Sequence, residues 1–324
     1  MFEKLLQQSD LSLDRLQSFC LVAEAGGVTK AAKGDPARQS LFRRQIKELE
    51  EFFGVELVRR SGRGVALTAA GRRLHALARE QLAGLQDFKH DCAGARQELT
   101  LAAGDSVIQW VLLPKLAELQ SKLHAVRLRV LNLSSAEIAS ALADGTIDLG
   151  IVRQGATGKL QNAPLGKMEF SLFVPNQLLG EGVKAPKHRS SGRESALVFR
   201  QMEPTDVGCY KKLMRLPLAT LEGAGEFRAG LERITRRKKV ALNLVLELSS
   251  FPLIARAVQG GVCAAFLPGQ ARVEFDPAEV VELQPDWLRP LGRELVLAWN
   301  PRLARIRTAV AQAVPVFRDV CCFG

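Results

Sequence analysis

The sequence predicts an α/β fold class in which an all-α-type N-terminal module, a winged helix-turn-helix, precedes a long linker helix and two α/β subdomains. Short helices and a two-strand turn are expected before residue 68, an apolar seam follows, and strands alternate with helices from residue 99. A chain of 324 residues with 47% hydrophobic and 24% charged residues has ordinary globular composition. We expect the winged helix-turn-helix over residues 1–70, the linker over 71–96 and the α/β part over 97–324.

Capping residues predict the first two helices. Ser12 can cap a first helix, whose apolar residues recur at three- and four-residue spacing until Gly26 and Gly27. A short second helix is expected from an N-cap at Thr29 to Gly34, a residue suited to the left-handed turn after a helix. Two short helices joined by a turn are typical of a helix-turn-helix.

A third helix is expected to begin at Asp35 and Pro36, a cap followed by a first-turn proline, and to end at Gly54. One face of this helix is apolar and the other is basic and polar. The apolar stripe comprises Phe42, Ile46, Leu49 and Phe53, and the polar face carries Ser40, Arg43, Arg44 and Lys47. Because a helix fits the major groove, where such side chains reach base edges and phosphates, the pattern favours duplex DNA as a partner.

Residues 57–60 and 65–67 predict two short strands around a turn at 61–64, which would form a wing. Such a wing would place Arg60 and Arg63 near the DNA backbone or minor groove. Part of the basic surplus that gives the chain its net charge of +11 lies here, since seven basic and four acidic residues are found between Arg38 and Gly71. A second basic surplus between Lys184 and Lys239 is more simply explained as a solvated surface.

Thr68 can cap the linker helix, which is expected from Ala69 to about Arg96. Its apolar seam consists of Leu74, Ala78, Leu82, Leu85, Phe88 and Cys92. A lone helix with such a seam requires a partner helix, which predicts dimerisation. Two-fold symmetry would suit a roughly palindromic operator.

These N-terminal residues resemble the LysR-type transcriptional regulators. The residues that carry the resemblance are Phe19, Ala23-Glu24-Ala25-Gly26, Thr29-Lys30-Ala31-Ala32, Gln39, Gln45-Ile46-Lys47, Leu49-Glu50, Phe53-Gly54, Leu57, Arg60 and Leu67-Thr68-x-x-Gly71. Their order and spacing match without gaps. The chain departs from the family pattern at residues 40–43, which read Ser-Leu-Phe-Arg where the family usually has Pro, a small residue, Val and Ser. The base preference of Arg43 therefore stays open.

The resemblance implies a sequence-specific DNA-binding regulator of transcription. The expected DNA contacts are Thr29, Arg38, Gln39, Ser40, Arg43, Arg44, Lys47, Arg60 and Arg63. The resemblance also implies a homodimer or homotetramer, operator or promoter DNA as the partner, and a contact with RNA polymerase if the protein activates transcription.

Beyond residue 97 the pattern predicts a first α/β unit with a parallel sheet. Its strands are expected at 99–103, 126–133 and 148–152, with helices at 112–123 and 136–143. Ligands of such sheets bind outside the carboxyl ends of the strands. A polar residue follows each of these strands, so the unit is expected to contribute to a ligand site.

A second α/β unit is expected next, with strands at 170–174, 217–221 and 243–248, and helices at 226–237 and from about residue 251. Residues 263–267 are expected to return as a strand to the first unit, which residues 294–299 and a helix at 301–317 complete. The first subdomain would then span 97–163 and 263–324, and the second 164–262. Two such subdomains enclose a cleft, as in a periplasmic solute-binding protein.

This part is similar to the effector domain of the same regulators, through Leu112-Leu113-Pro114, Gly145-x-x-Asp148-Leu149-Gly150, Gly260-Gly261-Val262 and Leu267-Pro268. The resemblance implies a small-molecule effector bound between the subdomains. The residues expected to line that pocket are Asp105, Ser106, Ser134, Ser135, Arg153, Thr220 and Ser249. Hydroxyl groups and helix N-termini suit a small anionic or polar metabolite.

Two other classes of function stay open at this point. An enzyme lacks support, because the four histidines (His75, His90, His124, His188) have no metal-binding spacing and no catalytic residue, metal site or cofactor motif is found. An architectural DNA binder, whose α/β part only oligomerises, would bind with little sequence preference.

Residue types also bear on the compartment. There is no long apolar run and no signal peptide, so we expect a cytoplasmic chain without a membrane span. Six scattered cysteines (Cys20, Cys92, Cys209, Cys263, Cys321, Cys322) suggest no disulfide framework, and the adjacent last two could be structural or redox-sensing. The sequence assigns no role to residues 190–214.

Overall fold

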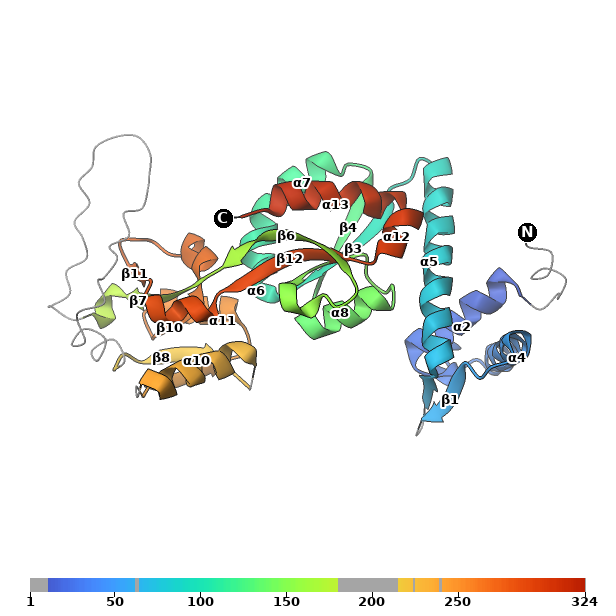
Figure 1. Cartoon of the computed structure of the whole chain (residues 1–324), viewed down its shortest axis with the longest axis horizontal. Helices are drawn as coiled ribbons and strands as arrows, with labels where there is room; N and C mark the ends of the chain where they lie inside the picture. Colours follow the sequence, from blue (N-terminus) through green and yellow to red (C-terminus); the bar gives the residue numbers. More distant parts are fainter. Residues whose placement is uncertain (1–10, 62–63, 180–214, 224, 239–240, 324) are drawn as a thin grey trace.

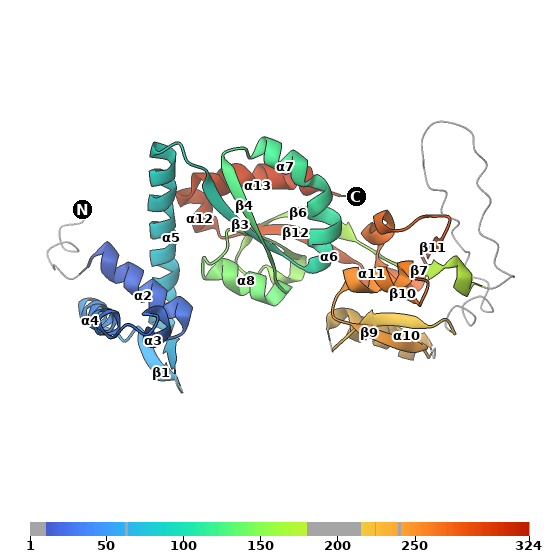
Figure 2. The same ribbon diagram turned by 180° about the vertical axis from the view of Figure 1, so that it is seen from behind.

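The structure, a computed structural model, describes residues 11–61, 64–179, 215–223, 225–238 and 241–323. Figure 1 shows an elongated chain in which a small helical module, a long helix and two sheet-containing subdomains follow one another along the molecule. Figure 2 shows the same order from behind. The predicted fold class is therefore confirmed.

The N-terminal module contains α2 (Leu13–Ala25), α3 (Val28–Ala31), α4 (Pro36–Phe53) and the hairpin of β1 (Val58–Ser61) and β2 (Gly64–Leu67). Three of the predicted caps are present: the Ser12 and Asp35 side chains accept backbone N–H groups of α2 and α4, and Gly54 ends α4 with a left-handed φ of 65°. These caps stabilise helix ends whose backbone groups lack intrahelical partners. The expectation for Thr29 is wrong, because α3 already begins at Val28 and Gly27 occupies the N-cap position.

The core of this module is small and apolar. Its buried members are Phe19, Val22, Ala32, Phe42, Ile46, Leu49 and Leu57. Three of the four residues of the predicted apolar stripe of α4 belong to it, whereas Phe53 at the helix end is 37% exposed. Burial of this stripe leaves the opposite face of α4 to solvent.

The linker helix α5 runs from Ala69 to Cys92, and its N-cap Thr68 accepts a hydrogen bond from the N–H of Gly71. It ends four residues before the expected Arg96, at a turn in which Gly94 has a φ of 62°. Only glycine fits at position 71, because a Cβ there would lie 2.0 Å from the carbonyl oxygen of Leu57. The hairpin and the linker helix therefore meet backbone to backbone.

The first α/β subdomain is built on a five-stranded sheet of order β4-β3-β5-β12-β6. Its strands are β3 (Gln97–Ala103), β4 (Val126–Asn132), β5 (Leu149–Arg153), β6 (Gln161–Met168) and β12 (Arg293–Trp299). β4, β3 and β5 are parallel, as predicted, and β12 pairs antiparallel with both β5 and β6. The carboxyl ends of the three parallel strands therefore meet at one edge.

The second sheet has the order β11-β7-β10-β8-β9. Its strands are β7 (Phe170–Pro175), β8 (Leu218–Leu221), β9 (Leu244–Leu248), β10 (Ala264–Pro268) and β11 (Val280–Leu283). The expected return to the first sheet at residues 263–267 is wrong, since β10 pairs with β7 and β8. After β9, a helix and a short turn lead into β10, which stays in the second sheet beside β8. The chain returns to the first sheet only at β12.

Helices cover both sheets (Figure 1). The α-helices are α6 (Asp105–Val107), α7 (Leu116–Lys122), α8 (Ser135–Ala143), α10 (Glu226–Lys238), α11 (Phe251–Gln259), α12 (Pro301–Ile306) and α13 (Thr308–Cys321). The short helical turns are η1 (Ile108–Leu112), η2 (Leu113–Lys115), η3 (Gln154–Ala156), η4 (Asn176–Leu178), η5 (Gly269–Glu274) and η6 (Asp286–Leu291).

Two predicted helices are interrupted. The helix expected over 112–123 is α7 preceded by the π turn η1 and the 3₁₀ turn η2, which contains Pro114 and so lacks one backbone donor. The last helix is divided at Arg307, which has an extended backbone and a buried side chain.

Candidate nucleic-acid interface and ligand cleft

The polar face of α4 is presented to solvent. Arg38, Ser40, Arg43, Arg44 and Lys47 are all exposed, and Gln39 is half-buried. The predicted contacts outside α4 are also exposed at Thr29 and Arg60, whereas Arg63 lies outside the described residues. The sequence therefore predicted correctly which side of the helix is free to meet a partner.

Gln39 joins the turn and α4 in a small polar network. Its amide Nε2 donates to the carbonyl of Gly34 at 3.2 Å, and its Oε1 accepts from the Thr29 hydroxyl at 3.4 Å and from Arg43 Nη2 at 3.5 Å. Three of the predicted DNA contacts thus lie together. The network holds Arg43 in place on the exposed face, which reduces the side-chain entropy lost on binding.

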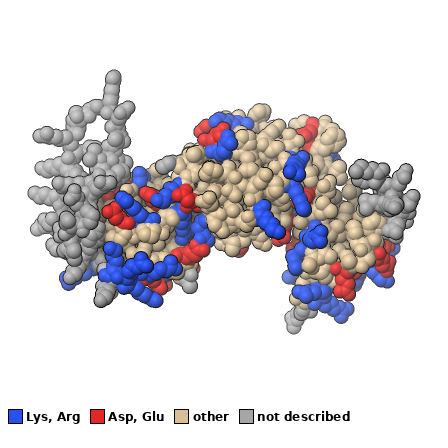
Figure 3. Space-filling view, in the orientation of Figure 1, with Lys and Arg blue, Asp and Glu red and all other residues tan. Residues whose placement is uncertain are grey.

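The cations of this module differ in their partners. Arg44 and Lys47 pair with Glu48 and Glu51 one turn later, at 3.7 and 3.4 Å. Over the residues that the structure describes, Arg43 and Arg60 have no carboxylate partner. Basic side chains gather over this module at the lower right of Figure 3, and a second basic group lies at the lower left. Unpaired arginines are suited to phosphate or base contacts.

The predicted ligand residues lie at strand ends. Asp105 and Ser106 follow β3, Ser134 and Ser135 follow β4, and Arg153 ends β5. Because these strands are parallel neighbours, their residues lie along one edge of the first sheet. Thr220 and Ser249 lie at the corresponding ends of β8 and β9, which are also parallel neighbours.

Two of these polar residues already have local partners. Ser134 caps α8 in a capping box with Glu137, and Asp105 Oδ1 accepts from the N–H of Ser106 at 2.6 Å. Ser250, and not the exposed Ser249, caps α11. Thr220 is buried, and its hydroxyl has no hydrogen-bond partner among the residues that the structure describes. Local capping therefore accounts for Ser134, while Thr220 keeps an unsatisfied polar group.

Arg153 connects the two subdomains, because its guanidinium forms an ion pair with Glu226 at the start of α10. Next to it lies Arg293, a residue that the sequence did not indicate. Burial, and secondarily the charge of Arg153, lower the pKa of Arg293 to about 10. The guanidinium carbon of Arg293 lies 5.7 Å from the ring centroid of Phe170.

Three phenylalanines form a compact aromatic group where the chain enters the second subdomain. The rings of Phe170 and Phe227 are stacked with centroids 4.6 Å apart, and Phe251 lies 5.1 Å from Phe227 and 5.8 Å from Phe170. All three are buried. Of the neighbouring charged side chains, Arg293 lies over one of these rings, that of Phe170.

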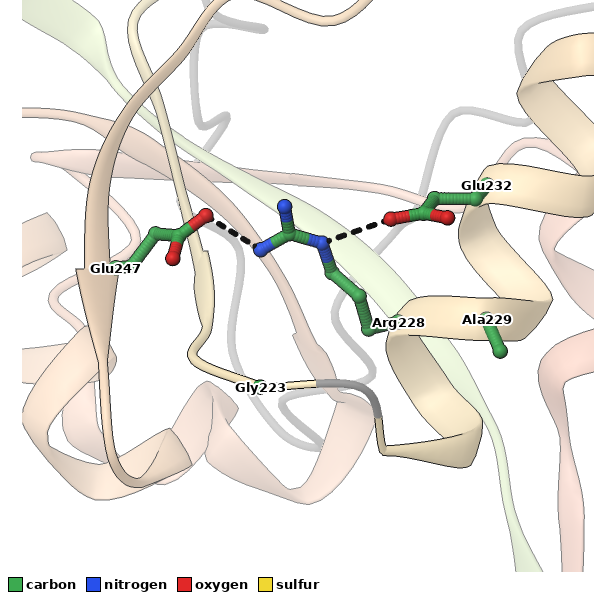
Figure 4. Close-up of a pocket in the computed structure, with 5 residues that line it drawn as sticks. All are labelled: Gly223, Arg228, Ala229, Glu232 and Glu247. Carbon is green, nitrogen blue, oxygen red and sulfur yellow. Dashed lines mark hydrogen bonds and ion pairs between the residues drawn. The ribbon is translucent and has the colours of Figure 1, made fainter.

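A hollow of about 290 Å³ lies beside α10 and is lined by Gly223, Arg228, Ala229, Glu232 and Glu247. Figure 4 shows Arg228 between the two carboxylates, with 2.6 Å to Glu247 and 3.1 Å to Glu232. None of the predicted ligand residues lines it. Since its cation is already paired twice, this hollow has no charge left for an anionic ligand.

A second charge cluster joins α5 to the first subdomain. Arg307 donates to both carboxylate oxygens of Asp87 on α5, at 2.7 and 3.0 Å, and also pairs with Asp148. Asp148 Oδ2 in turn accepts the N–H of Thr100 at 2.7 Å. Burial alone would lower the pKa of Arg307, but the Asp87 hydrogen bonds and the charge of Asp148 raise it. The guanidinium therefore stays charged.

The same junction contains Glu80 and Asn300. Glu80 of α5 is 1% exposed, and its carboxylate accepts a hydrogen bond from the Asn300 side chain at 3.2 Å. Burial raises the pKa of Glu80. Its position on α5 gave no signal for this role, because its partner lies 220 residues away along the chain.

The C-terminal cysteines differ in exposure. Cys321 is buried, and burial raises the pKa of its thiol to about 11, whereas Cys322 is exposed. A protonated, buried thiol reacts slowly, which favours the structural interpretation for Cys321. Among the described residues, no helix combines the length and apolar composition needed to cross a membrane.

Comparison with known proteins identifies both parts of the chain. Residues 13–72 match the model of bacterial regulatory helix-turn-helix proteins of the lysR family, and residues 93–205 match the LysR substrate binding domain. A probable nitrogen assimilation transcriptional activator of Synechococcus elongatus is 29% identical over 277 residues, covering 84% of each chain. A probable hydrogen peroxide-inducible genes activator of Mycobacterium xenopi is 32% identical over 169 residues, covering 51% of this chain and 89% of the relative.

Solved structures show the same fold. A full-length OxyR variant from Pseudomonas aeruginosa has a TM-score of 0.61 at 18% identity, with 96% of this chain and 94% of that chain covered. Full-length LysG from Corynebacterium glutamicum with bound effector Arg has a TM-score of 0.61 at 17% identity, with 94% and 99% covered. The relatives are regulators, which excludes the enzyme hypothesis. The chain belongs to the LysR family of DNA-binding transcriptional regulators.

Proposed function

We propose that this regulator binds a specific operator and that a small polar or anionic metabolite in the cleft modulates the binding. The observation that carries the proposal is the ordered polar face of α4, where Gln39 holds Arg43 on an exposed helix surface. A positioned guanidinium can donate two hydrogen bonds to guanine in the major groove. Because duplex DNA is the proposed partner, we expect the protein to act in the cytoplasm.

The proposed effector site lies between the strand ends of the two sheets. Arg153 supplies positive charge there, and the buried Thr220 hydroxyl supplies an unsatisfied hydrogen-bonding group. A ligand that bridges the two sheets would favour one relative arrangement of the subdomains over another. That preference is the proposed means of control over operator binding.

We further propose that α5 mediates homodimer formation, alone or within a tetramer. Ala78 of the predicted seam is buried, whereas Leu85 and Phe88 on the same helix are 50% and 68% exposed. Large apolar side chains exposed along one helix mark a protein interface. Sedimentation equilibrium of the wild type and of Phe88→Glu would test this, with a shift toward monomer expected for the variant. If the protein activates transcription, RNA polymerase would be a further partner.

The experiment that tests the DNA proposal is fluorescence anisotropy with duplex from the region upstream of the gene, against a scrambled duplex, at two salt concentrations. Arg43→Ala should reduce the preference for the operator by about 1–3 kcal/mol if Arg43 contacts a base. Arg60→Ala should weaken binding to every duplex alike and reduce the salt dependence by about one phosphate contact.

Two outcomes would change the assignment of roles. Equal loss of affinity for both duplexes in Arg43→Ala would make Arg43 a phosphate contact. Equal, strongly salt-dependent binding of the wild type to all sequences, including candidate operators from elsewhere in the genome, would favour the architectural alternative.

A further inference from the structure

Arg153 and Arg293 lie on one face of the first sheet, at the edge that meets the second subdomain. In the antiparallel ladder of β5 and β12, Arg153 is directly opposite Leu295. Opposite residues share a face, and so do residues two apart on one strand, so Arg293 is the diagonal neighbour of Arg153 on that face. The sheet therefore brings two guanidinium groups together.

These two cations have only one carboxylate between them in the described part of the chain. Glu226 pairs with Arg153, whereas Arg293 contacts the ring of Phe170 and has no ion pair or hydrogen-bond acceptor there. Burial, and to a lesser extent the neighbouring charge of Arg153, lower the pKa of Arg293 to about 10, so this guanidinium stays protonated at neutral pH. The group carries one uncompensated positive charge.

The Arg153 and Glu226 pair is also easily displaced. Its side chains are 30% and 65% exposed, and a pair in such contact with water contributes little to stability. A ligand oxyanion that reaches both guanidinium groups would gain charge-assisted hydrogen bonds from two planar forks of donors. The ligand would thereby replace the single contact of Arg153 with Glu226 by several hydrogen bonds from the two arginines.

We propose that Arg153 and Arg293 together bind an oxyanion, a carboxylate or phosphate group of the effector, and that Glu226 occupies its place when no ligand is bound. This inference rests on the proposed effector cleft and names the chemistry that the cleft selects. Because Glu226 belongs to α10 of the second subdomain, an entering anion breaks a link between the subdomains. Ligand binding and subdomain movement are then coupled.

Calorimetric titration of the full-length protein with inorganic phosphate, succinate and neutral succinamide, at constant ionic strength, would test the proposal. Phosphate and succinate should bind in competition with each other, whereas succinamide should not bind. Arg293→Met should weaken anion binding about tenfold or more, because hydrogen bonds to charged groups are lost. Arg293→Lys keeps the positive charge but loses the planar fork of donors, so its affinity for the anions should lie between those of the wild type and Arg293→Met.

Glu226→Gln is the decisive variant. Removing the internal carboxylate should tighten phosphate or succinate binding, whereas a merely structural ion pair would give no gain. Arg289→Gln is the matched control, since Arg289 is 70% exposed, pairs with Asp286 and lies four residues before Arg293. The proposal is overturned if Arg293→Met and Arg289→Gln bind both anions as the wild type does, or if Glu226→Gln binds them no more tightly than the wild type.

Operator affinity, measured in parallel without any anion, separates this inference from the proposed function. Arg293→Met should keep wild-type affinity for DNA, because β12, which begins at Arg293, lies on the other side of α5 from α4 (Figure 1). If an anion binds at Arg293 but leaves operator binding unchanged, the anion site stands and effector control fails. If the operator is bound but no anion is, the DNA function stands and this inference fails.

Discussion

Two charge clusters join parts of this molecule, and they use the same residue types under opposite conditions. At the junction of α5 with the first subdomain, the Arg307 and Asp87 side chains are 9% and 7% exposed. At the proposed effector cleft, the Arg153 and Glu226 side chains are 30% and 65% exposed, and Arg293 beside them lacks an anion in the described part of the chain. The buried cluster, in which each charge is paired, stabilises the fold. The more exposed cluster, which has one positive charge in excess, can bind an anion.

The comparison has a mechanical consequence. The buried pairs and the contact of Gly84 with Ile306 hold α5 and the first subdomain together. The second subdomain is joined to the first by two chain crossings, by the hydrogen bonds of Gln109 and Trp110 to Glu274, and by the exposed pair in the cleft. Ligand-dependent movement is therefore expected between the two sheets, and not between α5 and the first sheet.

Arg307→Ala should have the largest effect. It leaves Asp87 and Asp148 buried without their cation, which destabilises proteins by about 3–5 kcal/mol. Urea unfolding followed by circular dichroism measures the change. Arg305→Ala, at an exposed site on α12 two residues before Arg307, is the control and should lie within about 0.5 kcal/mol of the wild type. Similar values for the two variants would mean that the junction is not held by these charges.

A smaller effect with a definite pH dependence is expected for Glu80→Gln. Burial raises the pKa of Glu80, so the folded state binds a proton more tightly than the unfolded state. The wild type therefore loses stability as the pH rises from the pKa of Glu80 in the unfolded state to its higher pKa in the folded state. Glutamine keeps an acceptor for Asn300 and carries no charge. The variant should be more stable than the wild type at neutral pH, and the difference should vanish below the unfolded pKa.

Unfolding free energies of both proteins between about pH 4 and pH 8 provide the test. Glu118→Gln, at a half-exposed site on α7, supplies the comparison for a carboxylate in contact with water. A variant that is less stable than the wild type at neutral pH would show that the ionised Glu80 carboxylate stabilises the junction.

The N-terminal module could be predicted almost residue by residue, because its signals are local. Ser12, Asp35, Gly54 and Thr68 act within one turn of their own positions, and each cap lies where the sequence placed it. The prediction of Thr29 as an N-cap was wrong because α3 begins at Val28, with Gly27 as its N-cap. The Thr29 hydroxyl instead donates a hydrogen bond to Gln39.

The cleft and the junction could not be predicted in this way. Arg307 and Asp87 are 220 residues apart, and Arg293 meets Arg153 only because β12 joins the first sheet after the whole second subdomain. The error at β10 has the same origin, since strand pairing between distant segments is fixed by packing and not by local pattern. The prediction for Ser134 was limited in a different way. Its side chain caps α8, so a local hydrogen bond already accounts for a residue that was expected to contact the ligand.

The smallest effect is expected for Arg153→Gln, and it bears most directly on the comparison. An exposed pair contributes about 0–1 kcal/mol, so loss of the Glu226 contact should change the free energy of unfolding by no more than that. Removal of one of two neighbouring cations also relieves the repulsion on Arg293, which offsets part of the loss. Chemical unfolding in the absence of anions measures the effect, with Arg236→Gln, an exposed partner of Glu232, as the matched control. A loss comparable to that of Arg307→Ala would mean that the cleft pair is structural, and the distinction between the two clusters would then fail.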